Sequence, residues 1–175
     1  RKEFIDSARR GKLAEQVANA VADPTDTEIA DFMETYKNNL QMPECVRVRH
    51  ILVAFAKGDD DAKKGEKKKK IDGIRLKLVD GGSFAELARQ YSDDPQSKKN
   101  GGDLGRLLRR GNAVPAFEEA AFSQEVDAIG SVVETQFGYH ILQVTRHIKA
   151  GEAPRDIIVD LIKGEKKTAA VQAFV

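Results

Sequence analysis

Residues 46–55 read Val-Arg-Val-Arg-His-Ile-Leu-Val-Ala-Phe, and this stretch decides the fold. The run is rich in β-branched residues, so it predicts a β-strand whose side chains alternate between two faces. One face carries Val46, Val48, His50 and Leu52, and the other carries Arg47, Arg49, Ile51 and Val53. His50 is therefore expected in the middle of a strand, on an apolar face.

A second β-rich stretch lies further along the chain, where residues 139–146 predict the last strand. One face of this strand carries His140, Leu142 and Val144. Residues 131–135 predict the strand before it, joined by a tight connection at Gln136-Phe-Gly138. If the strands that carry His50 and His140 are neighbours, the two imidazoles can meet beneath one site. A single histidine there is more often a hydrogen-bonded core residue, but two on equivalent faces near a candidate carboxylate favour a site.

Helices surround these strands in the sequence. Two of them begin with capping-box spacing, in which a hydroxyl and a later carboxylate satisfy free N–H groups. Thr25-Asp-Thr-Glu28 lies at the start of a helix over 27–40. Ser83-Phe-Ala-Glu86 lies at the start of a short helix, which ends at Ser92-Asp-Asp-Pro95. Further helices are predicted over residues 1–22, in the segment that ends at Gly81-Gly82, after Pro115 and after Pro154. Because strands and helices mix without strict βαβ alternation, the pattern predicts an α+β fold with a largely antiparallel sheet.

Composition and the length of apolar runs limit the kinds of protein that this chain can be. The 175 residues include 29 basic and 28 acidic side chains, so the net charge of +1 gives no argument for nucleic acid or an anionic membrane. No apolar run approaches the roughly 18 residues that a membrane span needs. Cys45 is the only cysteine, so an internal disulfide is impossible. The polar stretch 57–70, with four consecutive lysines, predicts a solvated loop that runs into a helix with an exposed basic face.

Three other kinds of chemistry find little support. Cys45, His50 and His140 lack the clustered spacing of metal ligands. A Cys-His nucleophilic pair is possible in principle, but Cys45 precedes the strand and nothing marks an oxyanion hole. Gly101-Gly-Asp-Leu-Gly105 lacks the Gly-Lys-Ser/Thr ending of a phosphate loop. It predicts instead a turn with positive φ that leads into a strand near residues 104–108.

Five motifs in order resemble the parvulin-type peptidyl-prolyl cis-trans isomerases, over residues 45–147. They are Val48-Arg-His-Ile-Leu-Val53, Phe84-Ala-Glu-Leu-Ala88 with Tyr91-Ser-Asp-Asp94, Gly101-Gly-Asp-Leu-Gly105, Val114-Pro-Ala-Phe-Glu118 and Gln136-Phe-Gly-Tyr-His-Ile-Leu142. Each motif alone is weak evidence, but five motifs in the order of the family argue against a chance resemblance. The resemblance implies a parvulin (FKBP-like) domain, with a four-stranded antiparallel sheet and surrounding helices.

The resemblance also implies an activity and its residues. The activity is rotation of X-Pro peptide bonds in unfolded or partly folded client polypeptides, without a metal or a cofactor. The implied catalytic residues are His50, Asp94 and His140. The implied walls of the proline pocket are Leu104, Ala113, Phe117, Thr135 and Phe137.

Two departures from the family pattern leave alternatives open. Ala113 stands where the pocket usually has a methionine, and residues 106–112 contain one extra residue. Both favour a second reading, a parvulin-fold chaperone or peptide-binding module with weak or no isomerase activity. A third reading is recognition of phosphorylated Ser/Thr-Pro through Arg109, Arg110 or Lys67–Lys70. The acidic residues 59–61 beside the lysines argue against a phosphate pocket.

The flanking helices resemble those of SurA- and PrsA-type foldases. In those proteins, segments before and after the parvulin domain pack together as a chaperone module. The resemblance thus predicts that residues 1–44 and 148–175 form one helical module around the domain at 45–147. It also implies the periplasm or outer surface of a bacterium. Simple helical packing without client binding remains an equal alternative.

Overall fold

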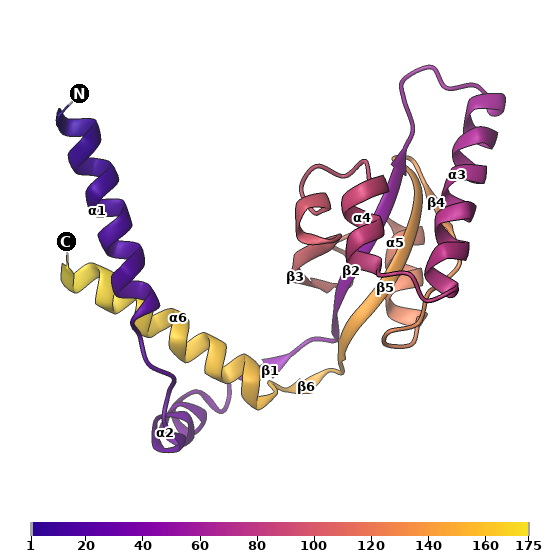
Figure 1. Ribbon diagram of the computed structural model, residues 1–175. Coiled ribbons are helices and arrows are strands. Elements are labelled where there is room, and N and C mark those ends of the chain that lie inside the picture. The colour runs from indigo at the N-terminus through magenta and orange to yellow at the C-terminus, as the bar shows by residue number, and fades with distance from the viewer. Residues whose placement is uncertain (1, 175) are drawn as a thin grey trace. The chain divides into compact units, whose positions relative to one another are not determined.

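The computed structural model of the chain describes residues 2–174, with side chains from residue 11 to residue 173 (Figure 1). The chain divides into two compact units. One contains the described residues up to Met42 together with those from Gly151 onward, and the other is Pro43–Ala150. The two segments that form the first unit therefore enclose the second unit in the sequence.

A four-stranded antiparallel sheet forms the centre of the unit Pro43–Ala150. Its strands are β2 (Cys45–Ala54), β3 (Asp103–Arg109), β4 (Val133–Thr135) and β5 (Gly138–Ile148), in the order β3-β2-β5-β4. β2 and β5 are the two central strands and pair along nearly their whole length. This arrangement confirms the α+β class and the antiparallel sheet that the sequence predicts.

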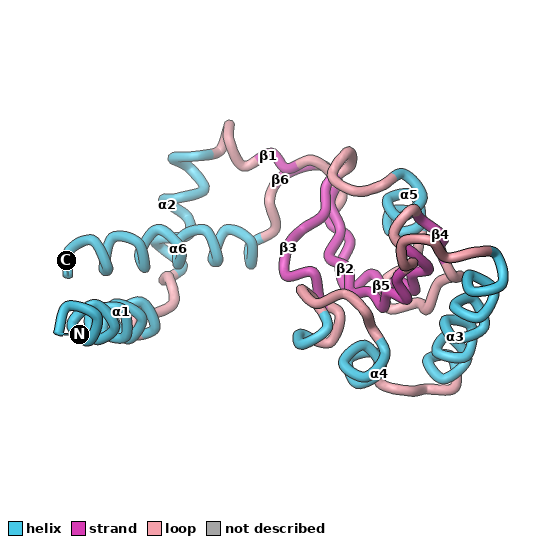
Figure 2. Tube along the Cα trace, turned by 90° about the horizontal axis from the view of Figure 1, so that it is seen from above, coloured by secondary structure: helices cyan, strands magenta, loops and turns pink. Residues whose placement is uncertain are grey.

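Helices cover both faces of this sheet (Figure 2). α3 (Asp61–Val79) and α4 (Phe84–Tyr91) pack on one face, and α5 (Pro115–Ser123) packs on the other. A single 3-10 turn, η1 (Lys98–Asn100), lies between α4 and β3. The sheet is therefore the middle layer of the unit, and each face of its central strands has its own helical cover.

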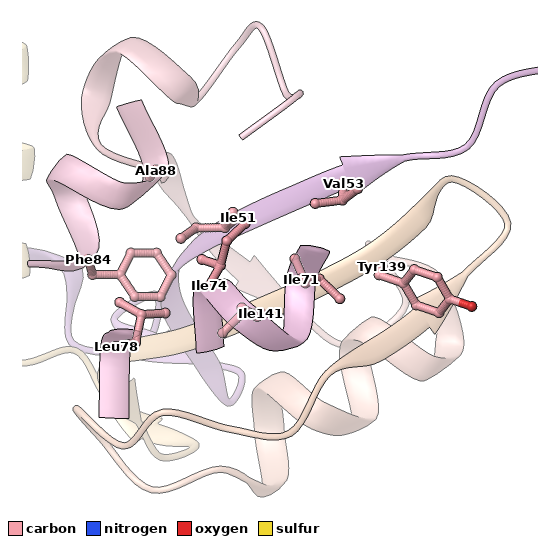
Figure 3. Packing of buried hydrophobic residues seen from close by; sticks show 9 residues of the cluster. All are labelled: Ile51, Val53, Ile71, Ile74, Leu78, Phe84, Ala88, Tyr139 and Ile141. Carbon is pink, nitrogen blue, oxygen red and sulfur yellow. The ribbon is translucent and has the colours of Figure 1, made fainter. Parts of the chain in front are cut away.

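Alternation along β2 and β5 supplies two separate cores. The cluster under α3 and α4 consists of Ile51, Val53, Ile71, Ile74, Leu78, Phe84, Ala88, Tyr139 and Ile141 (Figure 3). The cluster under α5 consists of Val46, Val48, Leu108, Phe117, Ala121, Phe122, Leu142 and Val144. Each fully buried aliphatic or aromatic side chain stabilises the fold by roughly 1.5–3 kcal/mol. The two-face reading of residues 46–53 is thus confirmed.

A bulge interrupts the ladder between the two central strands. Arg47 pairs with Arg146, but the next residue, Val48, pairs with Val144. Thr145 is therefore an extra residue on β5, and its Oγ1 donates to the carbonyl of Arg47 at 3.3 Å. Because of the extra residue, His147 and Val144 lie on the same face of the sheet, although they are three positions apart.

Local signals explain the helix boundaries. Asp60 caps α3, because its Oδ1 accepts from Lys63 N–H at 2.9 Å. The helix therefore begins early in the polar stretch, and the lysine run lies inside it. Lys68 pairs there with Asp72 one turn later, at 2.6 Å. Ser83 caps α4 by accepting from Glu86 N–H at 3.4 Å.

The other unit is mainly helical. It contains α1 (Lys2–Asn19), α2 (Asp26–Tyr36), α6 (Arg155–Phe174) and a pairing of two short strands, β1 (Gln41–Met42) with β6 (Gly151–Glu152). Its buried core consists of Ile29, Leu40, Ala153, Ile158 and Ile162. Thr25 and Glu28 form the predicted capping box at the start of α2.

Three details differ from the sequence expectation. α1 ends at Asn19 rather than near residue 22, and α2 ends at Tyr36 rather than near residue 40. Leu40 still joins the core, but from the segment after the helix. The strand expected over 131–135 begins at Val133. No helix in the described part of the chain is long and apolar enough to cross a membrane.

Candidate active site

The pairing of β2 with β5 brings two histidines together. His50 lies opposite Leu142, and His140 lies opposite Leu52, so the histidines are diagonal neighbours on one face. Their Nδ1 atoms are 3.3 Å apart, and their rings lie nearly parallel, at 16°. Both side chains are buried. The strands are therefore neighbours, and the two imidazoles meet.

Phe117 places an apolar surface beside the histidine pair. It lies on α5, the helix that covers this face of the sheet, and is itself buried. Its ring meets both imidazoles edge to face, with centroid distances of 5.7 Å to His50 and 5.4 Å to His140. Polar ring nitrogens and an aromatic surface thus adjoin at one place.

The loop after α4 carries the candidate carboxylate and is fixed to β2 through its backbone. Asp93 N–H donates to the carbonyl of Leu52 at 2.7 Å, and Leu52 N–H donates to Ser92 Oγ at 3.2 Å. The Asp93 side chain also accepts from Ala54 N–H at 3.1 Å. These contacts hold the next residue, Asp94, beside His50.

Asp94 accepts hydrogen bonds from three directions. His50 Nε2 lies 2.9 Å from Asp94 Oδ2, and Gln96 N–H donates to Oδ1 at 3.2 Å. Ser97 donates to Oδ2 through its hydroxyl and through its N–H. Burial alone would raise the pKa of Asp94, but the hydrogen bonds from Ser97 and His50 outweigh burial and lower the pKa to about 2. Asp94 is therefore a carboxylate at neutral pH.

At the other end of the pair, His140 Nε2 lies 2.9 Å from the hydroxyl of Thr135. Burial, together with repulsion from His50, lowers the pKa of His140 to about 4, so its imidazole is neutral at pH 7.

These states fix one direction for the chain of hydrogen bonds when His50 is neutral. The Thr135 hydroxyl donates to His140 Nε2, His140 Nδ1 donates to His50 Nδ1, and His50 Nε2 donates to Asp94. The chain therefore ends on a negative charge.

Gly102 sets the position of His50 from the β3 side. Its carbonyl accepts from His50 N–H at 2.9 Å, and its φ is +85°. A Cβ at this position would lie 2.4 Å from the carbonyl oxygen of His50. Only glycine combines that backbone conformation with so close an approach.

The predicted pocket residues occupy different surroundings. Leu104, Ala113 and Phe117 belong to the same apolar cluster, in which the first two are partly buried. Thr135 joins the histidine chain and also lines a pocket with Pro115. Phe137 lies in the turn between β4 and β5, with 55% of its surface exposed.

The segment 106–112, where the resemblance places the extra residue, contains the end of β3 and the turn after it. Gly111 N–H holds this turn by donating to Glu118 Oε2 at 2.6 Å. Ala113 follows the turn and packs against the cluster that contains Phe117. The small alanine thus lies beside Phe117 in this cluster, and its role in a proline pocket stays a prediction.

Sequence reasoning missed Ser92 and Ser97, which are both buried. Ser97 donates to Asp94, and Ser92 joins the loop to β2. The signal was present for Ser97, because an Asp followed two and three residues later by free N–H groups is the pattern of a helix cap. Here the hydrogen bonds from Gln96 and Ser97 N–H close the turn that precedes η1, and they also orient the carboxylate.

Other chemistries are not supported by this geometry. Cys45 lies five residues from His50 along β2, about 16 Å away at strand spacing. Burial raises the pKa of its thiol, which disfavours a thiolate nucleophile. The third histidine, His147, pairs with Glu44 at 2.7 Å. Within the described residues, no group of three or more His, Cys, Asp or Glu can hold a metal ion.

Known proteins are similar to this chain in sequence and in fold. Foldase protein PrsA of Caldanaerobacter subterraneus subsp. tengcongensis is 41% identical over 119 residues, which is 68% of this chain and 34% of that protein. The crystal structure of PrsA from Bacillus subtilis matches with a TM-score of 0.57 and 28% identity, over 98% of this chain and 61% of that one.

A structure from Campylobacter jejuni matches with a TM-score of 0.50 and 26% identity, over 98% of this chain and 67% of that one. It comes from work that describes PEB4 and the periplasmic protein Cj1289 as SurA-like chaperones. The chain spans between about a third and a half of the length of the first curated relatives it matches, at 34%, 45% and 52%.

The family model described as the PPIC-type PPIASE domain matches residues 32–147, more than half of the chain. This match contains the sheet, the helices that cover it and the histidine pair. The chain therefore belongs to the PPIC-type peptidyl-prolyl isomerase family.

Proposed function

We propose that this chain catalyses cis-trans isomerisation of X-Pro peptide bonds in unfolded or partly folded polypeptides. The observation that carries the proposal is the hydrogen-bonded chain from Asp94 through His50 and His140 to Thr135. Phe117 meets both imidazoles of this chain edge to face. Membership in the isomerase family and the match to PrsA foldases support the same activity.

The reaction suits a site without a nucleophile. Resonance opposes rotation of the C–N bond by about 18–20 kcal/mol, yet the two isomers of an X-Pro bond differ by only about 1 kcal/mol. A catalyst therefore needs only to bind the twisted amide more tightly than either planar form. Because resonance separates charge in the planar amide, an apolar surface disfavours the planar form and lowers the barrier.

Each part of the proposed site has a role in this scheme. Phe117, Leu104 and Ala113 would hold the proline ring on apolar surface. Asp94 and the histidines would orient the polar groups around the rotating carbonyl and keep their positions fixed during the turn. We assign Asp94 neither as a nucleophile nor as a base, because its low pKa makes it a weak proton acceptor.

The test compares two phenylalanines of α5 that are buried to a similar extent. The exposed fraction of the surface is 6% for Phe117 and 7% for Phe122. Only Phe117 contacts the histidine pair, since Phe122 packs against His147 and Arg110. We expect Phe117→Leu to lower kcat/KM about tenfold, since aromatic contacts contribute about 0.5–1.5 kcal/mol.

The assay is exchange NMR on a short Ala-Pro peptide, and we expect Phe122→Leu to retain near-parent kcat/KM. If the parent protein does not accelerate exchange above the uncatalysed rate, the proposed function is wrong.

We further propose that the helical unit holds unfolded segments of the same clients and that the chain works outside the bacterial cytoplasm. α6 carries a shallow pocket of about 530 Å³ that includes Leu161, a side chain with 47% of its surface exposed. Contiguous exposed apolar surface marks sites that bind other chains, and Leu161 would be the centre of such a surface on α6. The likeness to SurA-like chaperones, one of them named as periplasmic, supports both the role and the location.

A further inference from the structure

A second pocket adjoins the candidate active site on the side of Asp94. The loop after α4 and the first residues of β3 enclose a volume of about 310 Å³. Its polar lining includes the side chains of Gln96, Asn100 and Arg106. The residues that it shares with the candidate active site are Ser97 and Leu104.

The shared residues place this pocket within reach of a bound client. Ser97 donates its hydroxyl hydrogen to Asp94, and Leu104 packs on the cluster that contains Phe117. A peptide with its proline on Phe117 and Leu104 has its neighbouring residues only one or two backbone steps away, at about 3.3–3.6 Å per residue. One of those side chains would therefore enter the pocket.

Free hydrogen-bond donors of the pocket side chains favour an anion. Among the residues that the structure describes, the side chains of Arg106, Gln96 and Asn100 have no hydrogen bond or ion pair. Asp103, the carboxylate in the lining, already accepts from Arg47 at 3.1 Å and from Gly105 N–H at 2.8 Å. The adjoining turn η1 adds two further positive charges, on Lys98 and Lys99.

We propose that this pocket binds a side-chain carboxylate of the client, on a Glu or Asp close to the isomerised proline. A guanidinium can bind a carboxylate through two parallel hydrogen bonds, and the two carboxamides supply further donors. The inference rests on the proposed function, because it assumes that the proline occupies the surface formed by Phe117 and Leu104. It makes Arg106 a specificity-determining residue that lies outside the hydrogen-bonded histidine chain.

The experiment uses peptides acetylated at the N-terminus and amidated at the C-terminus, so that the only carboxylate is a side chain. Glu and Gln are compared at each of the two positions before and the two positions after the proline. We expect the parent protein to prefer Glu over Gln by about threefold to fivefold in kcat/KM at one position, the size typical of a partly exposed ion pair. The preference should shrink as salt rises.

Arg106→Gln should abolish this preference, because kcat/KM for the Glu peptide should fall to about the value for the Gln peptide. The matched control is Arg109→Gln, which removes the same charge from the same strand but lies opposite Cys45, at the other end of β3. This control should keep the preference for Glu.

Peptide affinities from NMR titration give the same comparison without any need for catalysis. Equal affinity for Glu and Gln peptides at all four positions, or a preference that survives Arg106→Gln, would overturn the inference. Absence of catalysis with every peptide would instead count against the proposed function, while the affinities would still decide the role of Arg106.

Discussion

The Nδ1 atoms of His50 and His140 lie 3.3 Å apart, although the two residues are 90 positions apart in the sequence. One nitrogen of such a pair must donate and the other must accept, so at most one proton is shared between them. The remaining ring nitrogens contact Asp94 and Thr135. The direction of the hydrogen bond between the two imidazoles therefore depends on the contacts that Asp94 and Thr135 make with the outer ring nitrogens.

Lowering the pH from 7 to 5 should destabilise the unit Pro43–Ala150. The pKa of His140 is about 4 in the folded protein but near 6.5 when the chain is unfolded. Between these values the unfolded chain binds more protons, so stability is lost as the pH falls through this window. The expected loss from His140 is about 2 kcal/mol, measured by urea unfolding at the two pH values.

His140→Asn is the control for this pH dependence, because asparagine has no ionisable group. The variant should be less stable than the parent at pH 7 but should lose less stability between pH 7 and pH 5. The low pKa of Asp94 acts in a separate window, below about 3.8, and does not disturb this comparison. Identical losses in the two proteins would contradict the neutral, buried placement of His140.

Two replacements of Asp94 should separate its charge from its hydrogen bonds. Asp94→Ala leaves the Nε2–H of His50 and the hydroxyl of the buried Ser97 without an acceptor, which should cost about 1–3 kcal/mol of stability. Asp94→Asn keeps one acceptor oxygen and should retain more of that stability. Both variants should lower kcat/KM by about tenfold if the negative charge matters for the reaction. Full activity in Asp94→Asn would show that the charge has no role.

Gly102→Ala should disturb the site more than the same change at a nearby glycine. Both Gly102 and Gly105 have positive φ, of +85° and +70°. A Cβ on Gly102 would meet the carbonyl oxygen of His50 at 2.4 Å, whereas a Cβ on Gly105 has nothing within 4 Å. Gly105→Ala should therefore cost about 1–2 kcal/mol for the backbone conformation alone.

Gly102→Ala should cost clearly more in urea unfolding and should also shift the NMR signals of the His50 ring. Equal losses of stability in the two variants would mean that the contact with His50 relaxes without consequence.

Much of this fold follows from short-range patterns that the sequence displays. Alternation in residues 46–53 separates two faces, and the structure places Val46 and Val48 under α5 but Ile51 and Val53 under α3 and α4. The spacing of Thr25 and Glu28 produces the capping box that it predicts. Such features depend on residues within a few positions of one another, so one sequence is enough to find them.

Features that depend on pairing between distant segments could not be predicted in this way. The bulge at Thr145 has no local signal, because it arises from the register between β2 and β5. The short pair of β1 with β6 joins residues more than 100 positions apart. Ser97 becomes part of the site only because the loop after α4 is held against the backbone of β2 by hydrogen bonds from Asp93 N–H and to Ser92 Oγ.

The proposed client-binding role of the helical unit depends on exposed apolar surface on α6. Leu161 lines the pocket on that helix and is 47% exposed, so Leu161→Asp should change the free energy of unfolding by only about 0.5 kcal/mol. Burial of the exposed half of this leucine against a client contributes roughly 0.7–1.5 kcal/mol, and aspartate cannot supply it. We therefore expect Leu161→Asp to weaken suppression of aggregation of a denatured client at least twofold.

Leu76→Asp is the matched control, since Leu76 is 62% exposed on α3, in the other unit of the chain. Light scattering measures aggregation of the client, and exchange NMR on a short Ala-Pro peptide measures isomerisation in the same samples. Both variants should isomerise the short peptide at the parent rate, because neither residue belongs to the proposed active site. Equal suppression by the parent and Leu161→Asp would mean that these helices only pack together and that the proposed active site beside Phe117 alone binds clients.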